Sequence, residues 1–286
     1  MTRSARSGSP TVAVAFGGGG ARGLAHIHVI EALDELGITP VAITGSSIGA
    51  IMGAGMAAGM RGADIREFTL ATVGRPREVM NRIWSLRPAT LSDVMTNGFR
   101  IGQYNLERVL KAFLPDLLPA DFRDLRIPLH VTATDYYGQT GLLIGEGDLF
   151  QALAASAAIP AVFMPVRING RIMIDGGVFN PVPFEYLFDK ADIVIGIDVV
   201  GAPAGDDSLM PNRIDSLFGA SQLMMQSIIA AKLRLRAPHI FLAPDVGRFK
   251  VLDFMRAAEV LETSSTVKDD IKRAIGAEFE KRLIAG

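Results

Sequence analysis

Residues 41–55 read VAITGSSIGAIMGAG, and the rest of the chain is organised around this stretch. A short apolar run leads into the pattern G-x-S-x-G, with Gly45, Ser47 and Gly49 at its fixed positions, and small residues typical of a closely packed helix follow. Glycines on both sides of a serine let the backbone fold back tightly, so the pattern predicts a strand, a sharp turn and a helix. Ser47 would then stand at the turn as a nucleophile, next to the unpaired amides of a helix N-terminus.

The same letters allow a second interpretation, a membrane helix. Residues 38–60 carry no charge, and Gly45, Gly49 and Gly53 repeat at the G-x-x-x-G spacing found where membrane helices pack. Glycine, alanine and hydroxyl residues provide little hydrophobicity, however, so membrane insertion would be weakly driven. We therefore favour a buried strand followed by a tightly packed helix.

The composition limits the classes of function. The chain has 286 residues, 29 basic and 30 acidic, and a formal net charge of −1, so no overall field favours nucleic acid as a partner. It has no cysteine, which excludes disulfides, thiolate catalysis and cysteine-based metal sites, and suits a reducing compartment. The apolar run near the N-terminus stops at four glycines and does not resemble a secretory signal, so we expect a cytoplasmic protein.

Length and pattern predict a single domain. We expect a disordered N-terminus over residues 1–10 and one domain over 11–286, with a core at about 12–200 and a helical extension at about 211–286. The hydrophobic fraction of 49% is high for a soluble domain, so part of it can face lipid.

Strands and helices alternate at the start of the chain. Residues 12–16 form an apolar run rich in valine and bounded by glycine, and residues 24–37 place apolar side chains at helical spacing before a capping glycine. Together with the strand and helix predicted within 41–60, this makes a β-α-β-α opening. Such an opening predicts an α/β fold, in which a parallel sheet carries helices on both faces.

The later patterns extend this arrangement. Strands are predicted at 127–134, 142–144, 193–200 and 240–243, helices at 148–158 and 216–233, and a hairpin at 166–174 around Asn169 and Gly170. The methionine-rich helix at 216–233 has a broad apolar face suited to core packing or to contact with a second copy of the chain. Residues 75–87 form a basic amphipathic segment that contains Trp84, and it can pack on the core or lie at a membrane surface.

The glycine-rich segment after the first strand has two interpretations. Gly18, Gly20 and Gly23 match the G-x-G-x-x-G pattern of dinucleotide-binding loops, but no acidic residue stands at the end of the next strand to hold a ribose. The alternative is an oxyanion hole, in which amides of consecutive glycines converge on one point. This loop and the G-x-S-x-G turn follow neighbouring parallel strands, so both would lie at the same edge of the sheet.

A serine nucleophile requires a base. Ser47, Asp175 and His239 would reproduce the serine, acid, histidine order of α/β-hydrolases, but His239 lies beside a proline at a strand start, where a structural role is usual. Asp175 is the stronger candidate because it ends a predicted strand and is followed by Gly176 and Gly177, which leave its carboxylate unobstructed.

Four ordered blocks resemble the patatin-like phospholipases: FGGGGARGLAHIHVI, GSSIG, ASAAIP at 155–160 and DGGVFNPVP at 175–183. The resemblance implies a three-layer α/β/α sandwich with a mostly parallel sheet, related to α/β-hydrolases but without their histidine. It also implies a Ser-Asp dyad of Ser47 and Asp175, with Gly18, Gly19 and Gly20 as oxyanion glycines. Arg22 matches the basic position after the glycines and would steady the loop or bind a phosphate head group, and Gly45, Gly49, Gly176 and Gly177 would support the turns.

These observations lead to one expected function and two alternatives. We expect a serine lipid acyl hydrolase, acting on phospholipid or another fatty-acyl ester, without metal or cofactor and with contact to a membrane surface. An acyltransferase would use the same acyl-enzyme with an acceptor other than water. A non-catalytic binding module of the same fold would have no chemical need for Ser47, Asp175 and the glycines.

Overall fold

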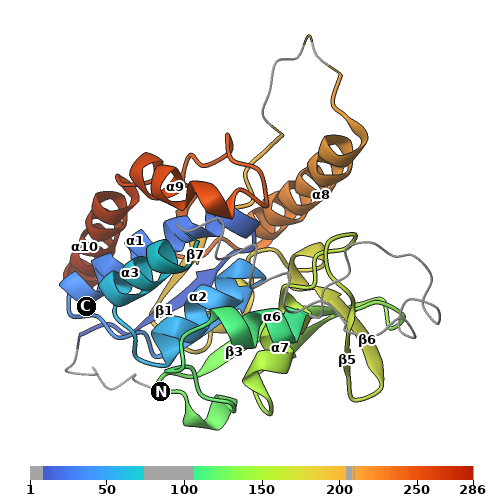
Figure 1. The fold of residues 1–286 in the computed structure, drawn as a ribbon. Helices are drawn as coiled ribbons and strands as arrows, with labels where there is room; N and C mark the ends of the chain where they lie inside the picture. Colours follow the sequence, from blue (N-terminus) through green and yellow to red (C-terminus); the bar gives the residue numbers. More distant parts are fainter. Residues whose placement is uncertain (1–8, 74–105, 204–207, 209, 286) are drawn as a thin grey trace, which may run out of the picture.

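The computed structural model describes residues 9–73, 106–203, 208 and 210–285 (Figure 1). Within them lies one eight-stranded sheet, in the order β5-β6-β3-β2-β1-β7-β8, with β4 also paired to β3. The strands are β1 (Val12–Phe16), β2 (Ala42–Ser46), β3 (Leu129–Asp135), β4 (Thr140–Ile144), β5 (Val166–Ile168), β6 (Arg171–Asp175), β7 (Ile193–Ile197) and β8 (Ile240–Leu242). The pairs β3-β2, β2-β1, β1-β7 and β7-β8 are parallel, and β4, β5 and β6 are antiparallel additions. The expected mostly parallel sheet is confirmed.

Helices cover both faces of this sheet (Figure 1). The α-helices are α1 (His26–Glu35), α2 (Ile48–Ala57), α3 (Gly62–Val73), α6 (Leu106–Phe113), α7 (Leu149–Ser156), α8 (Arg213–Leu235), α9 (Ala257–Thr263) and α10 (Val267–Ala285). The 3-10 helices are η1 (Gly20–Ala25), η2 (Phe122–Asp124), η3 (Gly176–Val178), η4 (Phe184–Leu187) and η5 (Phe254–Arg256).

The central strand β1 shows why there are two helical layers. Its side chains alternate between the faces of the sheet, and all five are buried. Val12, Val14 and Phe16 belong to a core with α1, α2, α7, α9 and α10, whereas Ala13 and Ala15 belong to a smaller core with η4 and α8. A strand buried on both faces is typical of an α/β protein, and the fold is a three-layer α/β/α sandwich.

The end of β2 meets the end of β6 because both strands pair with the same edge of β3. β4 pairs with β3 from Val131 to Asp135, and β2 and β6 each overlap part of that range, so both must occupy the opposite edge. β2 runs parallel to β3 and β6 runs antiparallel to it. The two strands therefore approach each other along one edge of β3 and bring the residues at their ends together.

The hairpin that delivers β6 has the predicted turn. Asn169 and Gly170 both adopt positive φ, 48° and 81°, between β5 and β6. Two consecutive residues with positive φ are the requirement of the tight hairpin turn that an Asn-Gly pair favours. The predicted strand pairing at 166–174 is confirmed.

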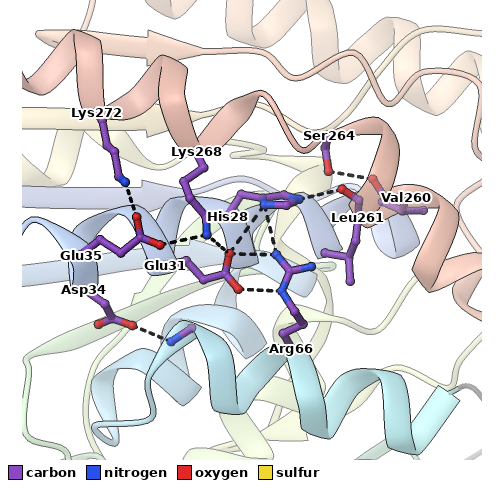
Figure 2. Close-up of polar contacts among 11 residues, drawn as sticks. His28, Glu31, Asp34, Glu35, Arg66, Val260, Leu261, Ser264, Lys268 and Lys272 are labelled. Atoms are coloured by element: carbon purple, nitrogen blue, oxygen red, sulfur yellow. Dashed lines mark hydrogen bonds and ion pairs between the residues drawn. The ribbon is translucent and has the colours of Figure 1, made fainter.

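A charged network fastens the C-terminal helix α10 to α1 and α3 (Figure 2). Glu31 of α1 receives two hydrogen bonds from Arg66 of α3, at 2.6 and 2.8 Å, and its Oε2 lies 2.9 Å from Nζ of Lys268 on α10. His28 accepts from the same Arg66 at Nδ1, so its Nε2 donates to the Leu261 carbonyl at 2.8 Å. Helices distant in sequence are thus joined at one carboxylate.

Two predicted segments fall outside the described part of the chain. These are the amphipathic segment 75–87 and most of the N-terminus predicted to be disordered, of which residues 9 and 10 are described. Among the described residues, no helix combines the length and the apolar character needed to cross a membrane. The charge-free stretch 38–60 forms β2 and α2 within the sandwich, so its interpretation as a membrane helix is wrong.

Candidate functional site

Ser47 occupies the strained corner between β2 and α2. It has φ 52° and ψ −124°, a conformation that non-glycine residues rarely adopt and that costs about 1–3 kcal/mol. The flanking glycines make the corner sterically possible. A Cβ on Gly45 would lie 2.5 Å from Cα of Ala50, and one on Gly49 would lie 2.2 Å from the Phe16 carbonyl oxygen. The G-x-S-x-G pattern thus forms the predicted strand-turn-helix.

The hydroxyl of Ser47 donates a 2.6 Å hydrogen bond to Oδ2 of Asp175. Both residues are buried, with exposed fractions of 4% and 7%. The second carboxylate oxygen, Oδ1, accepts the N–H of Gly177 at 2.7 Å. Each oxygen of the carboxylate therefore has one donor, and the side chain is held in a single orientation toward the serine.

Residues near the end of α7 position this pair from a third direction. The N–H of Ser47 donates to Oγ of Ser156 at 2.9 Å, and the N–H of Asp175 donates to the Ala158 carbonyl at 3.0 Å. The sequence block 155–160 had suggested no individual role for Ser156. Its only signal was a small hydroxyl residue within an otherwise apolar helix end.

Burial changes the acidity of Asp175. The loss of hydration raises the pKa of its carboxyl from 3.8 to about 6, although the hydrogen bonds from Ser47 and Gly177 act in the opposite direction. An aspartate with a pKa near 6 is largely ionised at neutral pH, yet it holds a proton far better than an exposed aspartate. The site therefore contains a carboxylate suited to accept a hydroxyl proton.

The glycine loop lies next to Ser47 and offers unpaired amides. Gly18 donates its N–H to the Pro181 carbonyl at 2.9 Å, and a Cβ on Gly18 would lie 3.3 Å from Cβ of Ser47. In the described part of the chain, the N–H groups of Gly19 and Gly20 have no acceptor. A Cβ on Gly19 would lie 2.2 Å from the Val199 carbonyl oxygen, so the backbone at Val199 packs directly against the glycine loop and leaves no room for a side chain there.

Arg22 fastens the same loop from inside. Its side chain is buried, and Nε donates to the Gly19 carbonyl at 3.1 Å. Burial lowers the pKa of Arg22 to about 10, which the nearby Asp198 and Asp253 partly oppose. Since the C=O and N–H of a trans peptide point in opposite directions, a fixed Gly19 carbonyl also fixes the direction of the Gly20 N–H. Arg22 has the geometry of a loop-steadying residue.

Gly176 and Gly177 permit the turn that follows the carboxylate. A Cβ on Gly176 would lie 2.2 Å from the Thr132 carbonyl oxygen, and one on Gly177 would lie 3.0 Å from Oδ1 of Asp175. The absence of side chains at Gly176 and Gly177 thus lets the chain turn close to Thr132 and to the carboxylate of Asp175.

A comparison with protein families places these residues in a known context. The profile described as patatin-like phospholipase matches residues 14–188, more than half of the chain, and includes the glycine loop, Ser47 and Asp175. The chain belongs to the patatin-like phospholipase family.

Relatives within this family share a region rather than a whole protein. An uncharacterized NTE family protein of Mycobacterium tuberculosis is 35% identical over 201 residues, which cover 70% of this chain and 52% of the relative. The lysophospholipase NTE1 of Cryptococcus neoformans var. neoformans is 30% identical over 210 residues, covering 73% of this chain and 12% of that protein. The chain thus spans about half the length of the mycobacterial relative and a small part of the fungal one.

Among solved structures, the chain is similar to full-length ExoU of Pseudomonas aeruginosa in complex with full-length SpcU. The TM-score is 0.48 at 16% identity, covering 95% of this chain and 53% of ExoU.

The segment beyond the patatin-like match completes the cavity at the site. A cavity of about 690 Å³ contains Ser47, Asp175 and the glycine loop, and α8 and the loop 247–251 contribute much of its wall. Leu217, Phe218 and Met224 contribute apolar surface on α8, beside the polar Asp215, Ser221 and Gln222. Arg248 and Lys250 lie on the loop 247–251, and Nζ of Lys250 lies 2.8 Å from Oδ1 of Asp215. This volume falls within the range of about 300–1,000 Å³ usual for small-ligand sites, so the cavity is large enough for a lipid chain beside the serine.

A second hollow adjoins the first. It measures about 550 Å³, is lined by aromatic residues including Tyr136, Tyr137 and Phe163, and shares the walls Pro160 and Ile174 with the cavity at Ser47. Ile174 directly precedes Asp175. The second hollow thus borders the strand that ends at Asp175, and Ser47 is not among its lining residues.

The histidines lie elsewhere. His239 precedes β8, and its Nδ1 accepts the N–H of Val194 near the start of β7. Ser47 instead follows the carboxyl end of β2. Because β2, β1, β7 and β8 are parallel, His239 lies at the amino ends of these strands, away from Ser47. His26 donates through Nε2 to the Gly17 carbonyl at 2.8 Å, and burial lowers its pKa to about 4. No histidine hydrogen-bonds Ser47 or Asp175 within the described residues, and this part of the patatin-like fold offers no triad through His239.

Proposed function

We propose that the protein is a serine lipid acyl hydrolase of the phospholipase A, lysophospholipase or esterase type. The observation that carries this proposal is the 2.6 Å hydrogen bond from Oγ of Ser47 to Oδ2 of Asp175, made by a serine held at φ 52°. A buried carboxylate with a raised pKa that accepts a hydrogen bond from a strained serine is the arrangement of a nucleophile and its base.

In the first half of the reaction, Oδ2 of Asp175 takes the Ser47 proton as Oγ attacks the carbonyl carbon of a fatty-acyl ester. A bond forms between Oγ of Ser47 and the carbonyl carbon, and the carbonyl oxygen becomes an oxyanion. When this intermediate collapses, the bond to the leaving alcohol breaks and Asp175 returns the proton to that alcohol. The product of this half is an acyl-serine ester.

The amides of Gly19 and Gly20 are the donors that we assign to the oxyanion. They have no acceptor in the described structure, whereas the Gly18 N–H is held by Pro181, so Gly18 shapes the loop instead of donating. The N–H of Ile48 at the start of α2, which has no acceptor among the described residues, is a further donor beside Ser47. Removing one such donor typically costs about 2.7–4 kcal/mol of transition-state stabilisation.

In the second half, a water molecule attacks the acyl carbon while Asp175 accepts one of its protons. Ser47 leaves with that proton, and the fatty acid is released. Because this half differs from acyl transfer only in the acceptor, an alcohol in place of water would yield a new ester. The reaction with water is the one that we propose.

The substrate class follows from the cavity. Its α8 wall includes the apolar side chains of Leu217, Phe218 and Met224, its volume suits a fatty-acyl chain, and the fungal relative is itself named a lysophospholipase. We therefore assign a phospholipid or a related fatty-acyl ester as substrate. Met210 and Met224 at the cavity are 94% and 62% exposed and would meet lipid at a membrane surface.

The test combines a fluorophosphonate serine probe with nitrophenyl esters of increasing chain length. Wild type, Ser47→Ala, Ser46→Ala, Asp175→Asn and His239→Ala are compared. Ser46 is the matched control because it is the neighbouring buried serine, and its hydroxyl has no hydrogen-bond partner within the described residues. Wild type, Ser46→Ala and His239→Ala are expected to take the label and to hydrolyse esters, whereas Ser47→Ala and Asp175→Asn remain inactive.

Other outcomes contradict the proposal in distinct ways. Loss of activity in His239→Ala would show that the base is a histidine. A wild type that binds lipid vesicles but takes no label would support a binding module. Formation of new esters with added alcohols, at the expense of free fatty acid, would identify an acyltransferase.

A further inference from the structure

A turn at residues 180–183 contacts both halves of the proposed catalytic machinery. Its Pro181 carbonyl accepts the N–H of Gly18 at 2.9 Å, and its Pro183 carbonyl accepts the hydroxyl of Thr44 at 2.9 Å. Thr44 lies in β2, three residues before the nucleophile. The glycine loop and the strand that presents Ser47 are thus attached to the same turn.

The turn also reaches the acid. The N–H of Asn180 donates to the Gly176 carbonyl at 2.8 Å, and the next residue, Gly177, donates its N–H to Oδ1 of Asp175 at 2.7 Å. A displacement of the turn would therefore move the donor that orients the carboxylate as well as the start of the glycine loop.

Lys232 of α8 holds this turn in place. Its Nζ donates to Oδ1 of Asn180 and to the Val182 carbonyl, both at 2.5 Å, and lies 2.6 Å from Oε2 of Glu185 in an ion pair. The ammonium group also lies 4.5 Å from the centre of the Phe184 ring. Two of the three N–H groups of the ammonium thus donate to the turn, and the carboxylate of Glu185 in η4 supplies the opposite charge beside it.

We propose that Lys232 is a positioning residue for catalysis. It fixes the turn 180–183, and through this turn it sets the glycine loop and Asp175 at their working positions relative to Ser47. This inference rests on the proposed hydrolase function, and it assigns a role to a residue outside the segment that matches the family profile.

The alternative is that Lys232 only stabilises the packing of α8. The two roles differ in what they predict. A packing residue affects the free energy of unfolding, whereas a positioning residue affects the rate of the bound complex, because small displacements of reacting groups lower the rate without weakening substrate binding. The local hydrogen bond from Gly18 to Pro181 supplies a further measure that is independent of activity.

The experiment compares wild type with Lys232→Met, Lys232→Arg and Arg236→Met. Methionine keeps much of the lysine volume but has no N–H donor. Arginine keeps the charge and the donors. Arg236 is the matched control, since it is a cation at the end of the same helix, with its guanidinium 3.8 Å over the Phe188 ring, and none of its side-chain contacts among the described residues reaches the turn. For each variant, kcat and KM on a nitrophenyl ester, the melting temperature and hydrogen exchange at the Gly18 amide are measured.

For Lys232→Met we expect kcat to fall about 10- to 100-fold with KM within about twofold, together with faster exchange at Gly18. Lys232→Arg should recover part of the lost kcat and part of the protection of the Gly18 amide from exchange. Arg236→Met should match wild type in both measurements. If hydrogen exchange at the Gly18 amide is unchanged in folded Lys232→Met, the inference is overturned. A kcat equal to that of wild type, measured well below the melting temperature of Lys232→Met, would also overturn it. Faster exchange in Lys232→Met alongside an inactive wild type would support the coupling and contradict the hydrolase function instead.

Discussion

Ser46 and Asp175 stand opposite consecutive residues of β3, Thr132 and Ala133. Strand pairing by itself therefore brings the residue after Ser46 to the end of β6, although 128 positions separate Ser47 from Asp175. The backbone hydrogen bonds of β2 and β6 to the same edge of β3 hold Ser47 and Asp175 close together before any substrate binds. The hydrogen bond between the two side chains is a consequence of that register, and no loop closure is needed to form it.

The pH dependence of hydrolysis should follow Asp175. As a base, it must be ionised, and burial raises its pKa to about 6. We expect kcat/KM to rise with pH and to level off above an apparent pKa of about 6. The measurement is a pH series with a neutral nitrophenyl ester, and Asp198→Asn is the control, because burial raises the pKa of that aspartate too. If kcat/KM rises with an apparent pKa below about 4, the assignment of the buried Asp175 as the base is contradicted.

The same carboxylate should reduce stability at neutral pH. A folded pKa of about 6 above an unfolded value of 3.8 means that the native state loses stability as pH rises between these values, and the full cost remains above pH 6. Two pKa units correspond to roughly 3 kcal/mol at most. The free energy of unfolding of Asp175→Asn, measured with urea, should therefore exceed that of wild type by about 1–3 kcal/mol at pH 8. Below pH 4 the two should differ little. A less stable Asp175→Asn at pH 8 would contradict this.

Two glycine-to-alanine substitutions should act in opposite directions. A Cβ on Gly49 would lie 2.2 Å from the Phe16 backbone oxygen, so Gly49→Ala must displace β1 or α2, at a cost of about 3 kcal/mol or more. Gly276 lies exposed in α10, and a Cβ there would meet nothing within 4 Å, so Gly276→Ala should gain about 0.5–1 kcal/mol. Melting temperatures of the two variants provide the check. Equal shifts would show that the corner is not sterically constrained.

Glu31 should contribute stability that disappears in acid. Burial alone would raise the pKa of Glu31, but hydrogen bonds from Arg66 and Lys268 outweigh it and lower the pKa to about 2. The contribution is therefore complete above pH 4.5 and is lost as pH falls toward 2. Arg66 and Lys268 are each about 30% exposed, so we expect Glu31→Gln to cost about 1–3 kcal/mol at pH 7, less than a fully buried pair would.

Unfolding of Glu31→Gln at pH 7 and pH 3 measures this contribution. The control is Glu107→Gln, which removes an exposed ion pair with Lys111 and should cost less than about 0.5 kcal/mol. A Glu31→Gln variant as stable as wild type at pH 7 would show that solvent screens the network.

Several elements could be predicted because their signals are local. The Asn169–Gly170 turn, the apolar run of β1 and the glycines around Ser47 each meet a requirement of the backbone within a few residues, so sequence alone indicates them. Order along the chain then placed the glycine loop and the nucleophile at one edge of a parallel sheet.

Other roles depend on contacts that no local pattern contains. Lys232 interrupts the apolar face of a predicted helix, and only the folded chain shows that its ammonium meets the turn at 180–183. Similarly, Gly18, Gly19 and Gly20 look equivalent in sequence, but the amide of Gly18 donates to the Pro181 carbonyl, whereas those of Gly19 and Gly20 find no acceptor in the part of the chain that the structure describes.

The sequence by itself determined the elements, the corner at Ser47 and the family blocks, because steric limits on glycine and the alternation of apolar residues act over short distances. Only the tertiary structure decided how closely the expected pair Ser47 and Asp175 approach, how far burial raises the pKa of Asp175 and which residues form the cavity wall on α8. These depend on which strands share an edge of β3 and on how much water the packed layers exclude, and both arise from residues far apart in the chain.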